Sequence, residues 1–133
     1  MGAQRFQEVE FGKTPEAAFA AAVEKARYEY GARGYTGSLA EKTSFRVIDL
    51  PGRLDLRKFL GLLGEHDGTE ESLKKIPENY RGYVESAFSC YDDKWGNAIA
   101  VQVKGQKAKD MRVRLDLGLK RGAFWVFCGW ASS

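Results

Sequence analysis

The chain has 133 residues, of which 44% are hydrophobic and 29% are charged, and its formal net charge is +3. This length and composition predict one globular domain whose core needs neither a disulfide nor a metal. No segment approaches the roughly 20 apolar residues that span a bilayer, and no apolar signal core follows the N-terminus, so we expect a cytoplasmic protein without a membrane partner.

Lysine and arginine are unevenly distributed along the chain. Residues 104–133 carry seven of them against two aspartates, whereas residues 1–103 carry a small excess of acidic residues. A basic C-terminal third suits a phosphate-bearing partner such as a nucleotide or a nucleic acid. Solvated ends of β-hairpins produce the same asymmetry, so both interpretations stay open.

The first part of the chain predicts a strand followed by a helix. Residues 6–11 are typical of a short strand that ends at Gly12. Thr14 as N-cap and Pro15 at the first helical position then mark the start of a helix. Apolar residues at helical spacing continue this helix up to Gly31, which is a stop signal.

The middle of the chain alternates between extended and helical patterns. Residues 44–49 predict a short strand, and residues 54–63 carry leucines and a phenylalanine at helical spacing. A short helix is expected over 69–76 and a second long helix over 79–93. Gly82 lies inside this long helix, where it costs about 1 kcal/mol relative to alanine, and we expect it to mark a close approach to a neighbouring backbone.

The last third reads as three strands, over residues 99–103, 111–117 and 123–129, joined by short turns. Consecutive strands with short connections predict an antiparallel meander. The predicted fold is therefore a single α+β domain over residues 1–133. It combines this C-terminal meander and an N-terminal strand with two longer helices packed on one face of the sheet.

The strongest candidate for a ligand-binding segment is a glycine-spaced loop over residues 31–42, after the first helix, which we call the glycine loop. Its glycines permit positive φ angles, and Ser38 followed by Glu41 has the form of a capping box. Free amides at a helix start can bind an anion, but the Glu41 carboxylate can equally well occupy them and leave only a capped connection. The candidate ligand-binding residues here are Arg33, Gly34, Tyr35, Thr36, Gly37, Ser38 and Lys42.

A second candidate surface is the polar face of the predicted strand 111–117, which carries Arg112 and Arg114. If Trp125 and Phe127 lie beside these arginines, the two strands form a cationic and aromatic platform for bases. If these rings are buried instead, the face is an ordinary polar surface. Trp95 completes the predicted ligand-binding set.

Residues for catalysis or metal binding are scarce. One histidine and two cysteines exclude a four-ligand zinc site of the usual Cys/His type, and we expect no metal and no cofactor. Both cysteines are flanked by aromatic residues and are expected to be buried thiols. A small hydrolase that uses His66, Asp92 or Asp93 is the weakest of the functional hypotheses, and no catalytic residue is assigned.

Three short motifs carry a resemblance to a known group of proteins. They are Gly-Tyr-Thr-Gly at 34–37 with Glu-Lys at 41–42, Lys-Trp-Gly at 94–96, and Gly-Trp-Ala-Ser at 129–132. Together they resemble small uncharacterised proteins encoded by bacteriophages and actinobacterial genomes. The resemblance implies no activity, but it implies a phage context in which such proteins act on host machinery and some sequester nucleotide immune signals.

The leading functional hypothesis is a non-enzymatic binding module for a phosphate-bearing ligand, consistent with sequestration of a nucleotide signal against host defence. The rival hypothesis is a protein-interaction module that inhibits a host enzyme through exposed rings such as Trp95 and Trp130. The sequence leaves open whether the protein forms a homo-oligomer.

Overall fold

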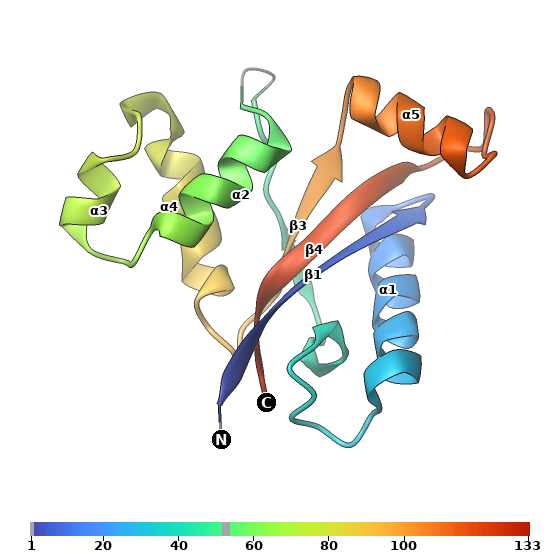
Figure 1. The fold of residues 1–133 in the computed structure, drawn as a ribbon, viewed down its shortest axis with the longest axis horizontal. Helices are drawn as coiled ribbons and strands as arrows, with labels where there is room; N and C mark the ends of the chain where they lie inside the picture. Colours follow the sequence, from blue (N-terminus) through green and yellow to red (C-terminus); the bar gives the residue numbers. More distant parts are fainter. Residues whose placement is uncertain (1, 52–53) are drawn as a thin grey trace.

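The computed structural model describes residues 2–51 and 54–133 and contains one four-stranded sheet. The strands lie in the order β1-β4-β3-β2, so that the last strand in the chain occupies an inner position (Figure 1). β4 is antiparallel to both of its neighbours, whereas β2 runs parallel to β3. The predicted α+β domain is confirmed, but the sheet is mixed and the predicted antiparallel meander is wrong. The strands are β1 Ala3–Gly12, β2 Phe45–Val47, β3 Ala98–Val103 and β4 Ala123–Ser132.

Most of the helices begin where the sequence offers a side-chain cap. The Thr14 hydroxyl accepts a hydrogen bond from the Ala17 amide at 3.1 Å, and the Asp55 carboxylate accepts one from the Lys58 amide at 2.8 Å. The first long helix therefore starts and stops as predicted. The helices are α1 Pro15–Tyr30, the 3₁₀ turn η1 Leu39–Glu41, α2 Leu56–Glu65, α3 Glu70–Lys74, α4 Glu78–Tyr91 and α5 Gln106–Arg114. Gly82 lies inside α4, yet apart from the backbone of its own helix no described atom comes within 4 Å of a Cβ placed on it. The close approach of a neighbouring backbone that the sequence predicted at this glycine is therefore wrong.

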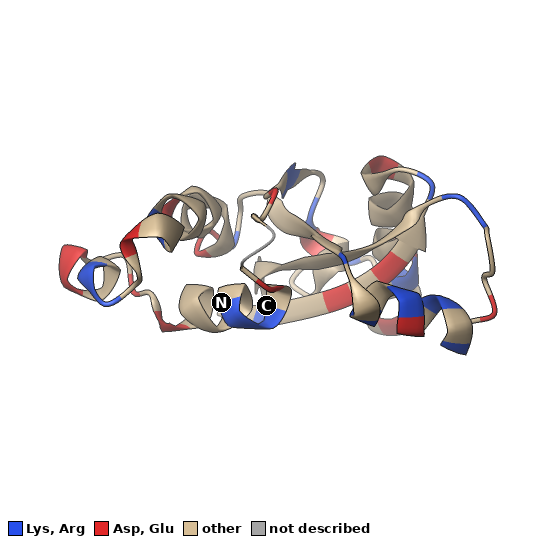
Figure 2. Ribbon diagram, turned by 90° about the horizontal axis from the view of Figure 1, so that it is seen from above, with Lys and Arg blue, Asp and Glu red and all other residues tan. Residues whose placement is uncertain are grey.

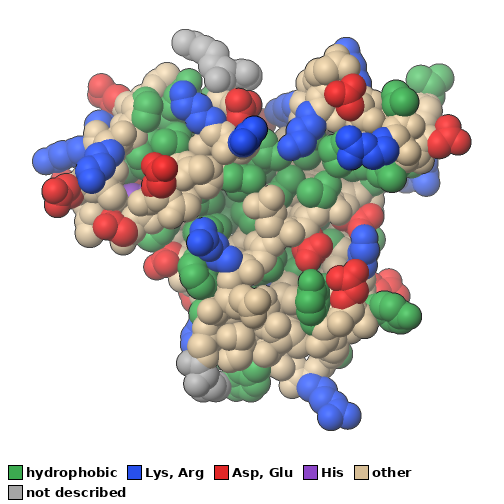
Figure 3. All heavy atoms as spheres, viewed as in Figure 1, with side chains coloured by type: hydrophobic (Ala, Val, Ile, Leu, Met, Phe, Trp, Pro, Cys, Tyr) green, Lys and Arg blue, Asp and Glu red, His purple; other side chains and the backbone are tan. Residues whose placement is uncertain are grey.

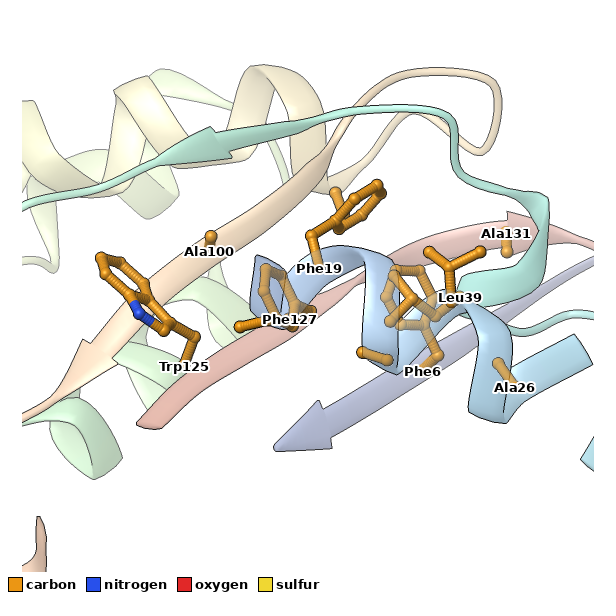
Figure 4. Packing of buried hydrophobic residues seen from close by; sticks show 12 residues of the cluster. Phe6, Phe19, Ala26, Leu39, Ala100, Trp125, Phe127 and Ala131 are labelled. Atoms are coloured by element: carbon orange, nitrogen blue, oxygen red, sulfur yellow. The ribbon is translucent and has the colours of Figure 1, made fainter. Parts of the chain in front are cut away.

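Helices cover both faces of the sheet, so the prediction of one covered face is wrong. On the first face, α1 packs its Phe19 ring against Phe127 of β4, with ring centroids 5.5 Å apart (Figure 4). On the opposite face, α2 and α4 pack against Ile99 and Val101 of β3. Strand alternation explains this division, because successive side chains of β3 and β4 point to opposite faces.

The third correction concerns the segment predicted as a strand over 111–117: residues 111–114 lie in α5, and residues 115–117 lie outside any helix or strand. Residues 106–112 are mostly good helix formers, and Gly105 provides the N-cap with a φ angle of 75°. Only Met111 of the alternating apolar residues within α5 packs against the core, whereas Val113 is 81% exposed. The alternating apolar residues of this segment are therefore not all buried as they would be in a strand, and the helix propensity of residues 106–112 decides the secondary structure.

The aromatic strand β4 is buried on both of its faces. Trp125 and Phe127 belong to the cluster under α1, and Phe124 and Val126 belong to a cluster that α5 covers. Of the two alternatives for these rings, the platform of Trp125 and Phe127 beside two arginines is therefore wrong, and the rings are buried. Within the described residues, no helix is both long enough and apolar enough to cross a bilayer.

Candidate functional site

The glycine loop has the backbone that its glycines predict. The φ angles are 94° at Gly31, 84° at Gly34 and 67° at Gly37. Tyr35 also has a positive φ, of 55°, which is uncommon for a residue with a side chain. Such a conformation costs free energy that local contacts must offset.

The Glu41 carboxylate provides those contacts. It accepts hydrogen bonds from the Tyr35 amide at 3.0 Å and from the Thr36 amide at 3.2 Å. The Thr36 hydroxyl donates a third hydrogen bond to it at 2.7 Å. The amides proposed for a ligand anion are thus bonded to a carboxylate of the chain itself, which an incoming anion would have to displace. This geometry corresponds to the capped connection rather than to an open anion site.

Two further polar groups of the loop also point inward. The Gly37 amide donates to the Ser132 carbonyl at 2.8 Å and so ties the loop to β4. Ser38 is only 3% exposed, and its hydroxyl lies 2.7 Å from the Thr36 hydroxyl and accepts a hydrogen bond from the Ala40 amide at 3.2 Å. Ser38 therefore caps η1, as its position before a helical turn predicts, but its hydroxyl does not face a ligand.

Lys42 is a structural residue and not a surface cation. Its side chain is buried, and its amine donates to the carbonyls of Asp93 at 3.2 Å, Lys94 at 3.2 Å and Gly96 at 2.8 Å. Burial lowers the pKa of the Lys42 amine, and the nearby Asp93 carboxylate opposes that effect. The lysine thus fastens the glycine loop to the turn after α4, and it is not accessible as a phosphate contact.

This connection brings two predicted site residues together at the surface. Tyr35 is 53% exposed and Trp95 is 64% exposed, and their ring centroids lie 6.4 Å apart at an interplanar angle of 86°. The Lys94 amine lies 5.4 Å from the centre of the Trp95 ring. Arg33 is exposed in the same loop. Tyr35 and Trp95 therefore form an exposed aromatic pair, and the hydrogen bonds of Glu41 and Lys42 hold the segments that carry it.

Arg112 and Arg114 lie on α5, at the opposite end of the sheet from the glycine loop (Figure 1). The Arg112 guanidinium donates to the carbonyls of Gly118 at 3.3 Å, Lys120 at 2.7 Å and Gly122 at 2.6 Å. It therefore holds the loop between α5 and β4 and has little capacity left for a ligand. Arg114 is exposed at the last turn of α5. The structure does not join these two arginines to the glycine loop.

A different site lies between α2 and α5, where the molecule is hollowed and Lys and Arg side chains stand on both sides of an apolar floor (Figure 3). We call it the α2–α5 notch, and its volume is about 460 Å³. One wall comes from residues 50–51 and 54–57, and the other comes from the end of β3 with the start of α5. The apolar lining residues are Leu50, Pro51, Leu54, Leu56 and Val103, and the cationic ones are Arg57, Lys104 and Lys107.

The start of α5 lies at the notch, which Gly105 and Lys107 line. Gly105 is the N-cap, and within the described residues no side chain caps the first amides of this nine-residue helix. α5 is basic over much of its length (Figure 2). Two carboxylates limit the positive charge nearby. Asp55 caps α2, and Asp49 forms an ion pair with Lys104 at 3.1 Å in which both side chains are largely exposed.

Sequence reasoning missed this notch. Arg57, Lys104 and Lys107 were not among the predicted site residues, and the two segments that form the walls are far apart in the chain. The only sequence signal for it was the surplus of cations after residue 103, but Lys104 and Lys107 were expected at the turn between two strands and not at the start of a helix.

The residues considered for catalysis are engaged in local structure. His66 is 8% exposed, its Nδ1 lies 2.7 Å from the Ser72 hydroxyl, and its ring packs against Phe88. The Asp93 carboxylate accepts a hydrogen bond from the Trp95 amide at 2.9 Å. In the part of the chain that the structure describes, no cluster of three or more His, Cys, Asp or Glu residues is arranged to hold a metal.

The two cysteines are free thiols. Cys128 is buried in β4, as expected, and burial raises the pKa of its thiol to about 12. It therefore stays protonated at neutral pH and acts as a small apolar side chain. Cys90 is half-buried.

Comparison with protein-family models, curated proteins and solved structures finds no match to this chain. The resemblance to phage and actinobacterial proteins stays a prediction.

Proposed function

We propose that the protein is a non-enzymatic binding module for a phosphate-bearing ligand, a nucleotide in the first place, and that the α2–α5 notch holds this ligand. The observation that carries the proposal is the combination, in one concave site, of three cationic side chains, the uncapped start of a helix and an apolar wall. Small-ligand sites are typically concave and largely apolar, with a few convergent polar groups.

The phosphate end of the ligand would lie against the start of α5. Free amides and the helix dipole favour an anion there, and Lys107 stands in the same turn. Arg57 supplies a planar guanidinium from the opposite wall, which suits two phosphate oxygens. Lys104 can exchange Asp49 for a phosphate at small cost, because an exposed ion pair contributes little to stability.

The base or another apolar part of the ligand would cover the leucines of the opposite wall. Leu54 and Val103 are buried at the floor, and Leu56 is half-buried beside them. The volume of about 460 Å³ falls within the range of roughly 300–1,000 Å³ that is usual for small-molecule sites. A mononucleotide or cyclic nucleotide fits this size better than a polymer, and sequestration of such a signal is the role that the phage resemblance would imply.

The test is isothermal titration calorimetry with a panel of linear and cyclic nucleotides at low salt. Arg57→Gln and Lys107→Gln should each weaken binding about tenfold or more, because each removes one charge-assisted contact. Lys109→Gln is the matched control, since Lys109 is exposed on the same helix but does not line the notch. Absence of binding at millimolar nucleotide, or an equal loss in all three variants, would refute the proposal.

A protein-interaction function is the second candidate, favoured by the exposed Tyr35–Trp95 pair. Exposed aromatic rings on a firm support are frequent anchors at protein interfaces. A host enzyme bound in this way should be released by Trp95→Ala but little affected by added salt, whereas nucleotide binding should weaken steeply with salt. Retention of the same host protein by wild type and by Trp95→Ala would exclude this candidate.

A further inference from the structure

Three aliphatic side chains are exposed where α5 ends and the chain turns back toward β4. Val113 is 81% exposed, Leu115 is 57% exposed and Leu119 is 100% exposed. In the part of the chain that the structure describes, no other valine, leucine or isoleucine is more than half exposed. Exposed aliphatic groups are therefore concentrated at this one end of the sheet (Figure 1).

The residues that pack α5 against the core are different ones. Ala108 and Met111 lie against the buried cluster, together with Leu117 of the turn after the helix. Val113 follows Met111 by two residues, or about 200° around the helix, and so lies on the solvent side. Lys109 shares that side, since it precedes Val113 by four residues. Val113 therefore contributes little to the core and stands beside a cation.

Arg112 holds the loop that carries Leu119 close to the last turn of α5. Its guanidinium donates to the carbonyls of Gly118, Lys120 and Gly122. The backbone on either side of Leu119 is therefore fixed, while the Leu119 side chain stays fully exposed. A fully exposed side chain has no pocket wall around it, so this surface suits an extended partner and not a small ligand.

Positive charge surrounds the exposed aliphatic side chains. Residues 106–121 contain six lysines and arginines and two aspartates, which gives a net charge of +4. β1 ends beside this segment, because Gly12 pairs with Ala123, and the residues that follow β1 add one cation and one anion, Lys13 and Glu16. The surplus therefore remains, and it is complementary to an anionic partner. The cations are Lys107, Lys109, Arg112, Arg114, Lys120 and Arg121, and the aspartates are Asp110 and Asp116.

An anionic lipid surface fits this combination better than a nucleic acid does. Residues 106–121 contain no aromatic residue, so they offer no ring on which a base could stack. Aliphatic side chains gain nothing from contact with a charged phosphate backbone, but they gain free energy when they enter the boundary between lipid headgroups and acyl chains. The lysines and arginines around them are attracted to anionic headgroups at the same time.

From these observations we infer that α5 and the loop after it bind the surface of an anionic membrane. Leu119 enters the headgroup region, and Leu115 and Val113 add apolar contact. The exposed cations that contact the anionic headgroups are Lys109, Arg114, Lys120 and Arg121.

This inference is independent of the nucleotide proposal, because none of these side chains lines the α2–α5 notch. It differs from the expectation that the protein has no membrane partner. That expectation followed from the absence of a spanning segment, and binding at a membrane surface needs no such segment.

The experiment measures co-sedimentation of the full chain with large vesicles at low salt. The vesicles contain phosphatidylcholine alone or phosphatidylcholine with one third phosphatidylserine. We expect binding to the anionic vesicles only, and a steep loss of binding as salt is added. The anionic vesicles should also slow hydrogen exchange over residues 113–121.

Leu119→Ser tests the apolar part of the contact. It should weaken binding to the anionic vesicles about tenfold, because it removes the side chain that enters the headgroup region. Tyr28→Ser is the matched control, since Tyr28 is 92% exposed but lies on α1, and it should leave binding unchanged. Both substitutions replace exposed side chains, so both variants should unfold at a urea midpoint close to that of wild type.

The double variant Lys120→Gln, Arg121→Gln tests the cationic part and should weaken binding about tenfold or more. Its control is the double variant Lys74→Gln, Lys75→Gln, which removes an exposed cationic pair in and after α3, at the far end of the molecule from α5 (Figure 1). This control should change binding by less than about twofold, through net charge alone.

The inference is overturned if the chain does not bind anionic vesicles at low salt, or if Leu119→Ser binds them as well as Tyr28→Ser does. It is also overturned if the two double variants lose binding equally. A short oligonucleotide that binds where vesicles do not would overturn it as well, since the basic surface would then serve a nucleic acid.

Discussion

Replacing Lys42 by methionine is the most direct test of how the glycine loop is held. The variant keeps most of the side-chain volume but removes the amine that donates to three carbonyls at 2.8–3.2 Å. Hydrogen bonds to charged groups contribute about 1.5–3 kcal/mol each, and the cost of burying the amine offsets part of their sum. We therefore expect Lys42→Met to lower the free energy of unfolding by about 3 kcal/mol, which corresponds to a decrease in Tm of about 10 °C.

The measurement is urea unfolding followed by circular dichroism, with thermal unfolding as a second probe. Lys94→Met is the control, because the Lys94 amine makes one exposed hydrogen bond, to the Gly2 carbonyl at 3.4 Å, and otherwise lies over the exposed Trp95 ring. It should change stability by less than about 0.5 kcal/mol. If Lys42→Met and Lys94→Met are equally stable, the three hydrogen bonds of the Lys42 amine do not stabilise the fold, and the role assigned to Lys42 is wrong.

The pH dependence gives an independent check on Lys42. Burial lowers the pKa of this amine in the folded state, so the unfolded state holds the proton more tightly. Stability then rises with pH between the lowered folded value and the ordinary lysine value. Wild type should gain stability relative to Lys42→Met over that alkaline range, and parallel pH profiles would contradict the assignment.

Four further substitutions test three separate features by urea unfolding. Burial raises the pKa of Glu8, so its ionised form opposes folding. Glu8→Gln should therefore stabilise the fold at pH 7. This advantage should vanish below about pH 3.5, where the carboxyl is protonated in both the folded and the unfolded state. Glu41→Ala removes the acceptor for two loop amides and a hydroxyl and should cost about 1–2 kcal/mol, with faster exchange of those amides. A Cβ on Gly12 would lie 2.5 Å from the Ala18 amide nitrogen, so Gly12→Ala should cost about 2 kcal/mol, whereas Gly61→Ala should gain up to about 1 kcal/mol.

Helix boundaries followed from sequence where they depend on local chemistry. Thr14, Pro15 and Gly31 specify the ends of α1 through hydrogen bonds and φ angles within a few residues, and the structure has them as predicted. The helical spacing of apolar residues likewise located α2 and α4.

One error was a wrong choice between two local patterns, and the others concern choices that local sequence does not determine. The alternation over 111–117 fits a strand, but its good helix formers and exposed Val113 belong to a helix that buries only a narrow stripe. Parallel pairing of β2 with β3 joins Phe45 to Ala98, and nothing near either residue specifies that register. The notch was missed for the same reason, since its two walls meet only in the folded chain.

The glycine loop shows how one carboxylate limits a functional prediction. Glycine spacing indicated that amides would be free to bind, and the sequence also offered Glu41 as their acceptor. Distances of 3.0 and 3.2 Å to those amides show that the chain uses its own anion. Only the exposed Tyr35–Trp95 pair keeps the loop of interest for binding.

The inner position of β4 has a consequence for biosynthesis. β1 leaves the ribosome first, yet its partner is the last strand to be translated, so that Ala3 must wait for Ser132. Until then β1 has no strand to pair with, because β4 separates it from β3 in the sheet. Nascent chains that stall before residue 123 would contain β1, β2, β3 and the described helices, but they would lack the strand that joins β1 to β3. The complete sheet is therefore expected to form after synthesis and not during it.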